Sequence, residues 1–114
     1  MNYGYIRYFE NDKDYYRQLF ELRKQGCQII YTEDSSSQND QSSKLDKLCN
    51  ELLDGDTVVV WKIDQFGATQ SQQVKRLIEL GIKKVKFKSV YENIDTSSDT
   101  GYEKIKTITS LRNF

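Results

Sequence analysis

The stretch VVVWKIDQFGATQ, residues 58–70, determines the fold that we expect for this chain. Its first four residues are β-branched or aromatic, which is typical of a strand covered on both faces of a sheet. The run ends at Asp64 and Gly67, and a polar segment of helical character follows. In open α/β sheets, sites lie where strands end and loops begin. Residues 64–68 are therefore the first place to search for chemistry.

The same succession of strand, helix and glycine recurs on both sides of this stretch. The patterns predict strands at 3–8, 27–32, 57–63 and 83–90, and helices at 12–25, 43–53, 71–80 and 101–114. Gly26, Gly55 and Gly81 are expected to close the first three helices. Polar loops are predicted at 33–41 and 91–100. Strands alternating with helices indicate an open, doubly wound, mostly parallel α/β sheet of four to five strands with flavodoxin-like topology.

The composition favours one small domain, residues 1–114, with no visible internal boundary. Apolar residues make up 37% of the 114 residues, charged residues 30%, and the formal net charge is zero. Attraction to nucleic acid would therefore need a local patch or a partner. No segment resembles a signal peptide or a membrane span, so the cytoplasm is the expected location. The chain has no histidine, which excludes a histidine zinc site or base. We expect no cofactor or metal, and we expect Cys27 and Cys49 to be small core residues.

Four stretches resemble one family of DNA-processing enzymes. They are YGYIR at 3–7, GCQIIYTEDSSS at 26–37, LLDGDTVVVWKIDQFG at 52–67 and ENIDTSSDTG at 92–101. Together they are similar to the catalytic domain of the serine site-specific recombinases, the resolvase/invertase family. The resemblance implies a resolvase-like fold, and DNA cleavage by attack of a serine hydroxyl on a phosphodiester surrounded by arginines. Arginine suits that task because its planar fork pairs with two phosphate oxygens.

The residues that carry this chemistry in the family are mostly replaced here. Arg7 matches the arginine of the first strand, but Phe9 stands where the family has its nucleophilic serine. Ser36 matches the serine of a Ser-Gly loop, whose glycine is replaced by Ser37. A phenyl ring cannot attack phosphate, so the position that matters most cannot perform the reaction.

Most of the arginines of the family are also replaced in this chain. The arginine that follows the Ser-Gly loop aligns with Ser42. Asp64 matches the aspartate of the family stretch Asp-Arg-Leu-Gly-Arg, whose two arginines are replaced by Gln65 and Ala68. One of four arginines survives, so the resemblance implies a vestigial, inactive site. We expect Arg7 to pair with Asp64 or to touch a phosphate, and Asp64 to cap the next loop.

A lysine stripe is expected on the fourth strand, at Lys84, Lys86 and Lys88. Lysines on an edge strand usually discourage pairing with another chain, and the alternative is a patch that contacts phosphate.

The expected partners follow from the resemblance. DNA is one, bound weakly by this chain alone, and a second copy or an active recombinase is another. No membrane or small-molecule substrate is expected. The family's long dimerisation helix would be truncated here, with no helix-turn-helix domain.

Two alternatives stay open. One is an active strand-exchange enzyme whose nucleophile has moved to Ser36 or Ser37. The other is a receiver-like phosphoacceptor module, in which Glu10, Asp12 and Asp64 would gather at neighbouring strand ends.

Overall fold

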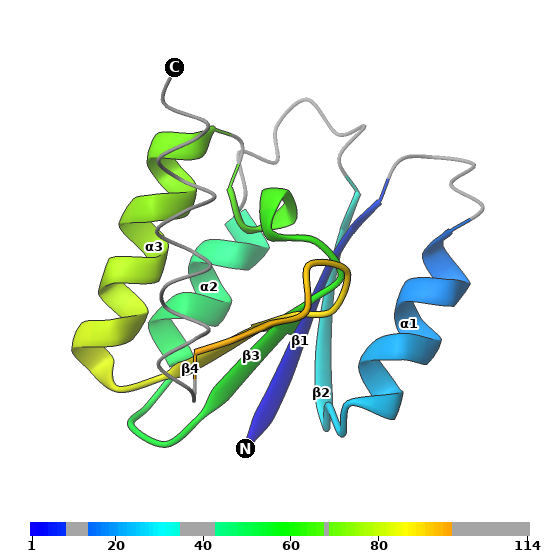
Figure 1. Cartoon of the computed structure of the whole chain (residues 1–114), viewed down its shortest axis with the longest axis horizontal. Helices are drawn as coiled ribbons and strands as arrows, with labels where there is room; N and C mark the ends of the chain where they lie inside the picture. The colour runs from blue at the N-terminus through cyan, green and yellow to red at the C-terminus, as the bar shows by residue number, and fades with distance from the viewer. Residues whose placement is uncertain (9–13, 35–42, 68, 97–114) are drawn as a thin grey trace.

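The chain folds around one sheet, with helices on both of its faces. The computed structural model describes residues 1–8, 14–34, 43–67 and 69–96. Its strands are β1 (Asn2–Tyr8), β2 (Ile29–Asp34), β3 (Thr57–Val60), β4 (Lys86–Ser89) and β5 (Ile94–Asp95). Its helices are α1 (Tyr15–Lys24), α2 (Ser43–Glu51) and α3 (Gln70–Lys83), with a 3-10 helix, η1 (Ile63–Phe66), after β3. Figure 1 shows α1 on one side of the sheet and α2 and α3 on the other.

The strand order is β2-β1-β3-β4-β5. The pairs β1–β2, β1–β3 and β3–β4 are parallel, and β4–β5 is antiparallel. This order is that of flavodoxin-like sheets, apart from the reversed last strand. The predicted open, mostly parallel α/β fold is confirmed.

The valine run lies at the centre of the sheet, as its composition predicts. All four residues of β3 are buried. Val58 and Val60 belong to the hydrophobic cluster beneath α2 and α3, whereas Val59 packs with Leu22 of α1 on the opposite face. Alternate side chains of β3 thus anchor both layers of helices, and each valine contributes about 1.5–3 kcal/mol by its burial.

Of the three glycines predicted to close helices, only Gly26 follows a helix end directly, because α2 ends at Glu51, four residues before Gly55. Gly26 and Gly55 adopt positive φ values of 87° and 92° after α1 and α2. Gly81, in contrast, lies within α3, and Lys84 adopts the left-handed conformation at φ 62°. Because α3 extends to Lys83, the chain leaves the helix at a point from which Val85 packs into the core, where it is 3% exposed.

All four predicted strands differ in their bounds, the first only by starting at Asn2 instead of residue 3. β2 starts and ends two residues later than predicted, so Glu33 and Asp34 belong to the strand. β3 ends at Val60, not at residue 63, because the chain then turns into η1 and buries Ile63 in the core. The fourth strand is also shorter than predicted, with only residues 86–89 paired.

The segment predicted as a loop at 91–100 contains β5, which the sequence did not reveal. Asn93, at φ 56°, reverses the chain so that Ser89 pairs with Ile94. β4 is therefore an interior strand, and the predicted edge-strand role of its lysines is wrong. Lys84 lies on no strand, and Lys88 faces Asp95 at 3.8 Å.

The outer face of α1 also differs from its sequence pattern. Tyr16, Leu19, Phe20 and Arg23 share helical spacing, yet Tyr16 and Phe20 are 77% and 65% exposed. Gln18 and Leu22 are the buried residues of this helix. The predicted helix at 101–114 lies outside the described residues.

Candidate functional site

The predicted site falls at the carboxyl ends of β1 and β3. Arg7 is the last but one residue of β1, and Asp64 and Gln65 lie in η1, directly after β3. The other predicted site residues lie outside the described residues; they are Phe9, Ser36, Ser37, Ser42 and Ala68. The structure therefore reports on the strand ends that would hold this site, and on three of its predicted residues.

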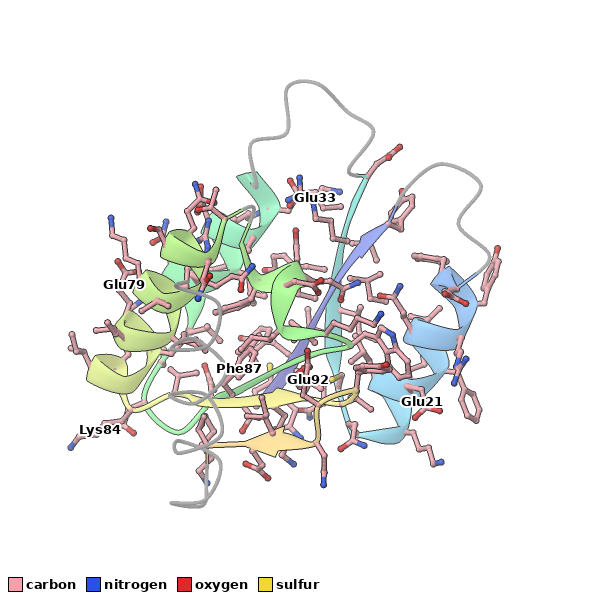
Figure 2. All side chains as sticks on the ribbon, turned by 45° about the horizontal axis from the view of Figure 1, so that its top comes forward. Glu21, Glu33, Glu79, Lys84, Phe87 and Glu92 are labelled. Atoms are coloured by element: carbon pink, nitrogen blue, oxygen red, sulfur yellow. The ribbon has the colours of Figure 1, made fainter. Side chains whose placement is uncertain are left out.

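Asp64 does not take the two roles predicted for it. Its side chain is exposed on η1, and no ion pair joins it to Arg7 among the described residues. The first amide of η1, that of Ile63, donates instead to the carboxylate of Glu92, at 3.2 and 3.3 Å from the two oxygens. Figure 2 shows Glu92 beside η1. The turn after Val60 rotates Asp64 away from β1, and Glu92 caps the loop in its place.

Gln65 takes the inward position at this strand end. Its Nε2 donates to Oε1 of Gln18 at 2.9 Å and to the carbonyl oxygen of Arg7 at 3.3 Å. Its own Oε1 is buried without a hydrogen-bond partner in the described structure. A buried acceptor of this kind typically costs about 1–3 kcal/mol. Gln65 thus ties η1 to β1 and α1 through an uncharged amide, and it leaves one acceptor unsatisfied.

A buried carboxylate lies on the other side of β1. Glu33 of β2 is 3% exposed and accepts a hydrogen bond of 2.7 Å from the hydroxyl of Tyr5. Its second oxygen lies 3.4 Å from the backbone nitrogen of Lys44, in the first turn of α2. Helix N-termini favour negative charge, so the start of α2 helps to hold this carboxylate in the interior. Figure 2 shows Glu33 between the end of β2 and the start of α2.

The Tyr5–Glu33 pair has a clear acid–base consequence. Burial raises the pKa of the Tyr5 hydroxyl well above its usual value, and the hydrogen bond to Glu33 raises it further, while the nearby Arg7 guanidinium opposes the rise. A phenol that stays protonated and donates to a carboxylate is a poor nucleophile. The Tyr5–Glu33 pair is therefore a structural polar contact and not an activated nucleophile.

Contacts with α3 fix the loop that follows Gln65. Gln73 of α3 is 5% exposed and donates from Nε2 to the carbonyl of Gly67 at 3.1 Å. A Cβ atom on Gly67 would come within 2.9 Å of the backbone nitrogen of Gln73, so only glycine fits. Thr69 caps α3 by accepting from the amide of Gln72 at 3.3 Å. These contacts fix the chain on both sides of residue 68.

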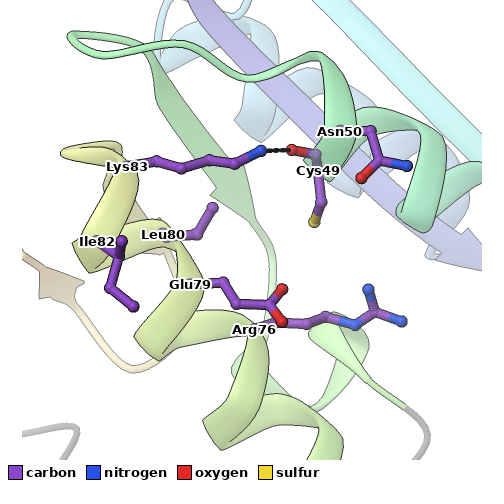
Figure 3. A pocket seen from close by; sticks show the side chains of 7 residues that line it. All are labelled: Cys49, Asn50, Arg76, Glu79, Leu80, Ile82 and Lys83. Carbon is purple, nitrogen blue, oxygen red and sulfur yellow. Dashed lines mark hydrogen bonds between the residues drawn. The ribbon is translucent and has the colours of Figure 1, made fainter.

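A separate hollow of about 350 Å³ lies between α2 and α3 (Figure 3). Lys83 donates from Nζ to the carbonyl of Cys49 at 2.8 Å, and Arg76 pairs with Asp46 at 2.7 Å. Burial raises the pKa of the Cys49 thiol, and burial likewise raises that of Cys27, to about 11. Both cysteines are free and pack against the hydrophobic clusters, as predicted from the sequence.

Sequence reasoning missed the polar residues that hold the strand ends. The sequence predicts a loop at Glu33, and the helical patterns that contain Gln18 and Gln73 are defined by their apolar residues. A signal existed for Gln18, which lies at helical spacing between Tyr15 and Leu22. An amide at a position that faces the sheet is worth noting, because a buried polar group needs a partner.

The family described as "Resolvase, N terminal domain" matches residues 2–114. The chain belongs to this family. The serine recombinase gin of Escherichia phage Mu is 33% identical over 98 residues, which cover 86% of this chain and 51% of that protein. A DNA-invertase of Enterobacteria phage P7 is also 33% identical over 98 residues, covering 86% of this chain and 53% of the relative.

A solved structure supports the same fold. The N-terminal catalytic domain of TP901-1 integrase superposes with a TM-score of 0.70 at 24% identity, covering 99% of this chain and 94% of that one. This resolvase-family chain spans about half the length of the curated relatives it matches. Membership of the serine recombinase family replaces the receiver-like alternative.

Within the described residues, no helix is long and apolar enough to cross a membrane, and no cluster of acidic or cysteine side chains could hold a metal ion.

Proposed function

We propose that this chain is a recombinase-family domain that does not cleave DNA, and that it acts in DNA recombination as a binding or regulatory module. The observation that carries the proposal is Gln65. Where the family resemblance places an arginine, this chain has a neutral amide that turns inward and is engaged by Gln18 and the Arg7 carbonyl. An amide held in this way supplies no positive charge to a phosphodiester.

The residue types at the other positions point the same way. Phe9 replaces the nucleophile, and Ser42 and Ala68 replace arginines. Loss of one donor that stabilises the transition state typically costs about 10²–10³ in rate, and loss of the nucleophile removes the covalent step altogether. The Tyr5 hydroxyl is not a replacement, because burial and the hydrogen bond to Glu33 hold it protonated.

The resolvase fold itself is retained, which supports a role that depends on the folded domain and not on its lost chemistry. We propose that residues 1–114 act as a single domain that binds a second copy or an active recombinase. Binding to duplex DNA by this chain alone would be weak, since its net charge is zero. A role on DNA would place the chain in the cytoplasm.

The experiment that tests this proposal restores the chemistry. The natural chain is fused to the long helix and DNA-binding domain of an active recombinase and assayed on that enzyme's recombination site. A second fusion carries Phe9→Ser, Ser42→Arg, Gln65→Arg and Ala68→Arg. A third carries the three arginines and keeps Phe9, as a matched control that restores charge without a nucleophile.

We expect covalent protein–DNA adducts from the second fusion alone. Adducts from the natural fusion would overturn the proposal. Loss of those adducts after Ser36→Ala or Ser37→Ala would then identify the relocated nucleophile. Adducts from the third fusion would show that serine at position 9 is not required.

A further inference from the structure

A surface on the α1 side of the molecule combines exposed aromatic rings with unpaired cations. It is formed by Tyr16, Arg17 and Phe20 of α1, Trp61 and Lys62 after β3, and Tyr91 after β4. We call it the aromatic–basic surface. Trp61, Lys62 and Tyr91 take part in the strand ends only through their backbone, since the Tyr91 amide donates to the Trp61 carbonyl at 2.8 Å and the Gln65 amide to the Lys62 carbonyl at 3.1 Å. The composition of the side chains therefore needs a separate explanation.

The rings and the cations alternate in space. The guanidinium carbon of Arg17 lies 5.3 Å from the centre of the Trp61 ring, and Nζ of Lys62 lies 4.6 Å from the centre of the Tyr91 ring. The two ring centres are 6.0 Å apart, at an interplanar angle of 57°. Both cations fall within the range of cation–π attraction, so each is held over a ring in a defined place.

The surface is open to solvent. Tyr16, Phe20 and Tyr91 are 77%, 65% and 65% exposed. Phe20 follows Tyr16 by four residues and Arg17 by three, so its ring neighbours both of these side chains on the helix. Large aromatic side chains gain stability when they are buried, and these contribute little to the core. Their exposure leaves ring faces available to a partner.

The charge of this region differs from that of the whole chain. α1 carries Arg17, Arg23 and Lys24 against the single carboxylate of Glu21, whereas the chain as a whole has zero net charge. Among the described residues, neither Arg17 nor Lys62 pairs with a carboxylate. The carboxylate of Glu92 is occupied by the Ile63 amide and the Ser89 hydroxyl. Arg17 and Lys62 thus form no ion pair within the described residues, and each can meet an anion.

We propose that the aromatic–basic surface binds single-stranded nucleic acid. An unpaired strand supplies both complements at once, because its bases stack on exposed rings and its phosphates meet the cations. A duplex supplies the phosphates but keeps its bases stacked inside. A second copy of the chain would bring like charges together. The proposal does not depend on whether the strand-end site cleaves DNA.

Trp61 makes the test direct, because it is the chain's one tryptophan and it lies within the surface. Its fluorescence is titrated with a single-stranded thymidine 12-mer and with a duplex hairpin of equal phosphate count. We expect saturable quenching by the single strand and at least tenfold weaker binding of the hairpin. We also expect the affinity to fall as salt is raised, since each phosphate contact contributes about −0.7 to the logarithmic salt slope on single strands.

Variants are compared by the anisotropy of a labelled 12-mer, which does not need Trp61. Tyr91→Ala and Phe20→Ala are expected to weaken binding by roughly five- to a hundredfold, the usual range for loss of one stacking ring. Leu53→Ala removes a similarly exposed apolar side chain elsewhere and is expected to have no effect. Arg17→Ala is expected to reduce the salt slope by about 0.7. Lys75→Ala removes one exposed positive charge from α3, outside the surface, and is expected to leave the salt slope unchanged.

The affected side chains are largely exposed, so the variants should fold, and circular dichroism checks this. Equal affinity for hairpin and single strand would overturn the proposal, as would equal effects of the surface and control variants. Absence of quenching at low salt would also overturn it. Quenching that depends on protein concentration without any oligonucleotide would instead identify a second copy as the occupant.

Discussion

Replacing Tyr5 by phenylalanine isolates the buried hydrogen bond to Glu33. Phenylalanine keeps the ring that packs in the main cluster and removes only the hydroxyl. Glu33 is then left with the Lys44 amide at 3.4 Å as its remaining contact among those described. A hydrogen bond to a charged group contributes about 1.5–3 kcal/mol, and the group left behind is 3% exposed. We expect Tyr5→Phe to lower the free energy of unfolding by about 2 kcal/mol.

Tyr31 provides a matched control for this change. Its hydroxyl also donates to a glutamate, Glu51, but this pair is exposed to solvent. Tyr31→Phe removes the same chemical interaction and should cost less than about 0.5 kcal/mol, because water replaces the lost partner. Urea unfolding followed by Trp61 fluorescence measures both variants. Equal costs for the two variants would refute the claim that burial makes the Tyr5–Glu33 bond important.

The same pair predicts a dependence of stability on alkaline pH. The pKa of Tyr5 is raised in the folded state above its ordinary value of 10.0. The unfolded chain therefore loses this proton first, so the contribution of Tyr5 is complete below pH 10 and is lost as the pH rises above it. Tyr5→Phe should remove that part of the alkaline decline, whereas Tyr31→Phe should leave it in place. Parallel declines in the wild type and in Tyr5→Phe would contradict the assignment.

Two further predictions concern a close contact and the free thiols. Gly67→Ala would place a Cβ within 2.9 Å of the Gln73 nitrogen, so we expect a loss of about 1–3 kcal/mol in urea unfolding, and an unchanged midpoint would contradict it. Cys27, with its pKa raised to about 11, should react with a disulfide reagent at pH 8 roughly a hundredfold more slowly than in urea. The Cys49→Ser variant keeps Cys27 as its one thiol. Equal reaction rates of this variant with and without urea would show that the Cys27 thiol is not protected by folding.

The sheet was predictable because β3 is extreme in composition. A run of valines leaves few options besides a central strand, and the alternation of strands and helices then determines the class of fold. β5 escaped prediction because it has two residues and its reversal depends on Asn93, which adopts a left-handed conformation without glycine. The prediction that Gly81 ends its helix was wrong, although glycine often ends helices. Here α3 continues to Lys83, and Val85 then packs into the core.

The places of Asp64 and Gln65 in the fold were predictable, but their contacts were not. Placing Asp64 and Gln65 after β3 followed from the pattern, and the structure confirms that location. Which of the two turns inward depends on the short η1, whose rotation exposes Asp64 and directs Gln65 toward Gln18. Glu92 caps η1 from 29 residues away, and no local pattern signals such a contact.

The hairpin of β4 and β5 bears on the order in which the molecule folds. Ser89 pairs with Ile94 across a short turn, so this contact closes a small loop and can form within microseconds. The parallel pairs must wait for longer loops to close; β1 and β3 join residues as far apart as Asn2 and Thr57. The backbone of β4 is thus covered early on the side away from β3. The outer edge of this side of the sheet is then the two-residue β5 and not the four-residue β4, so a nascent chain offers less open strand backbone for aggregation during its slowest steps.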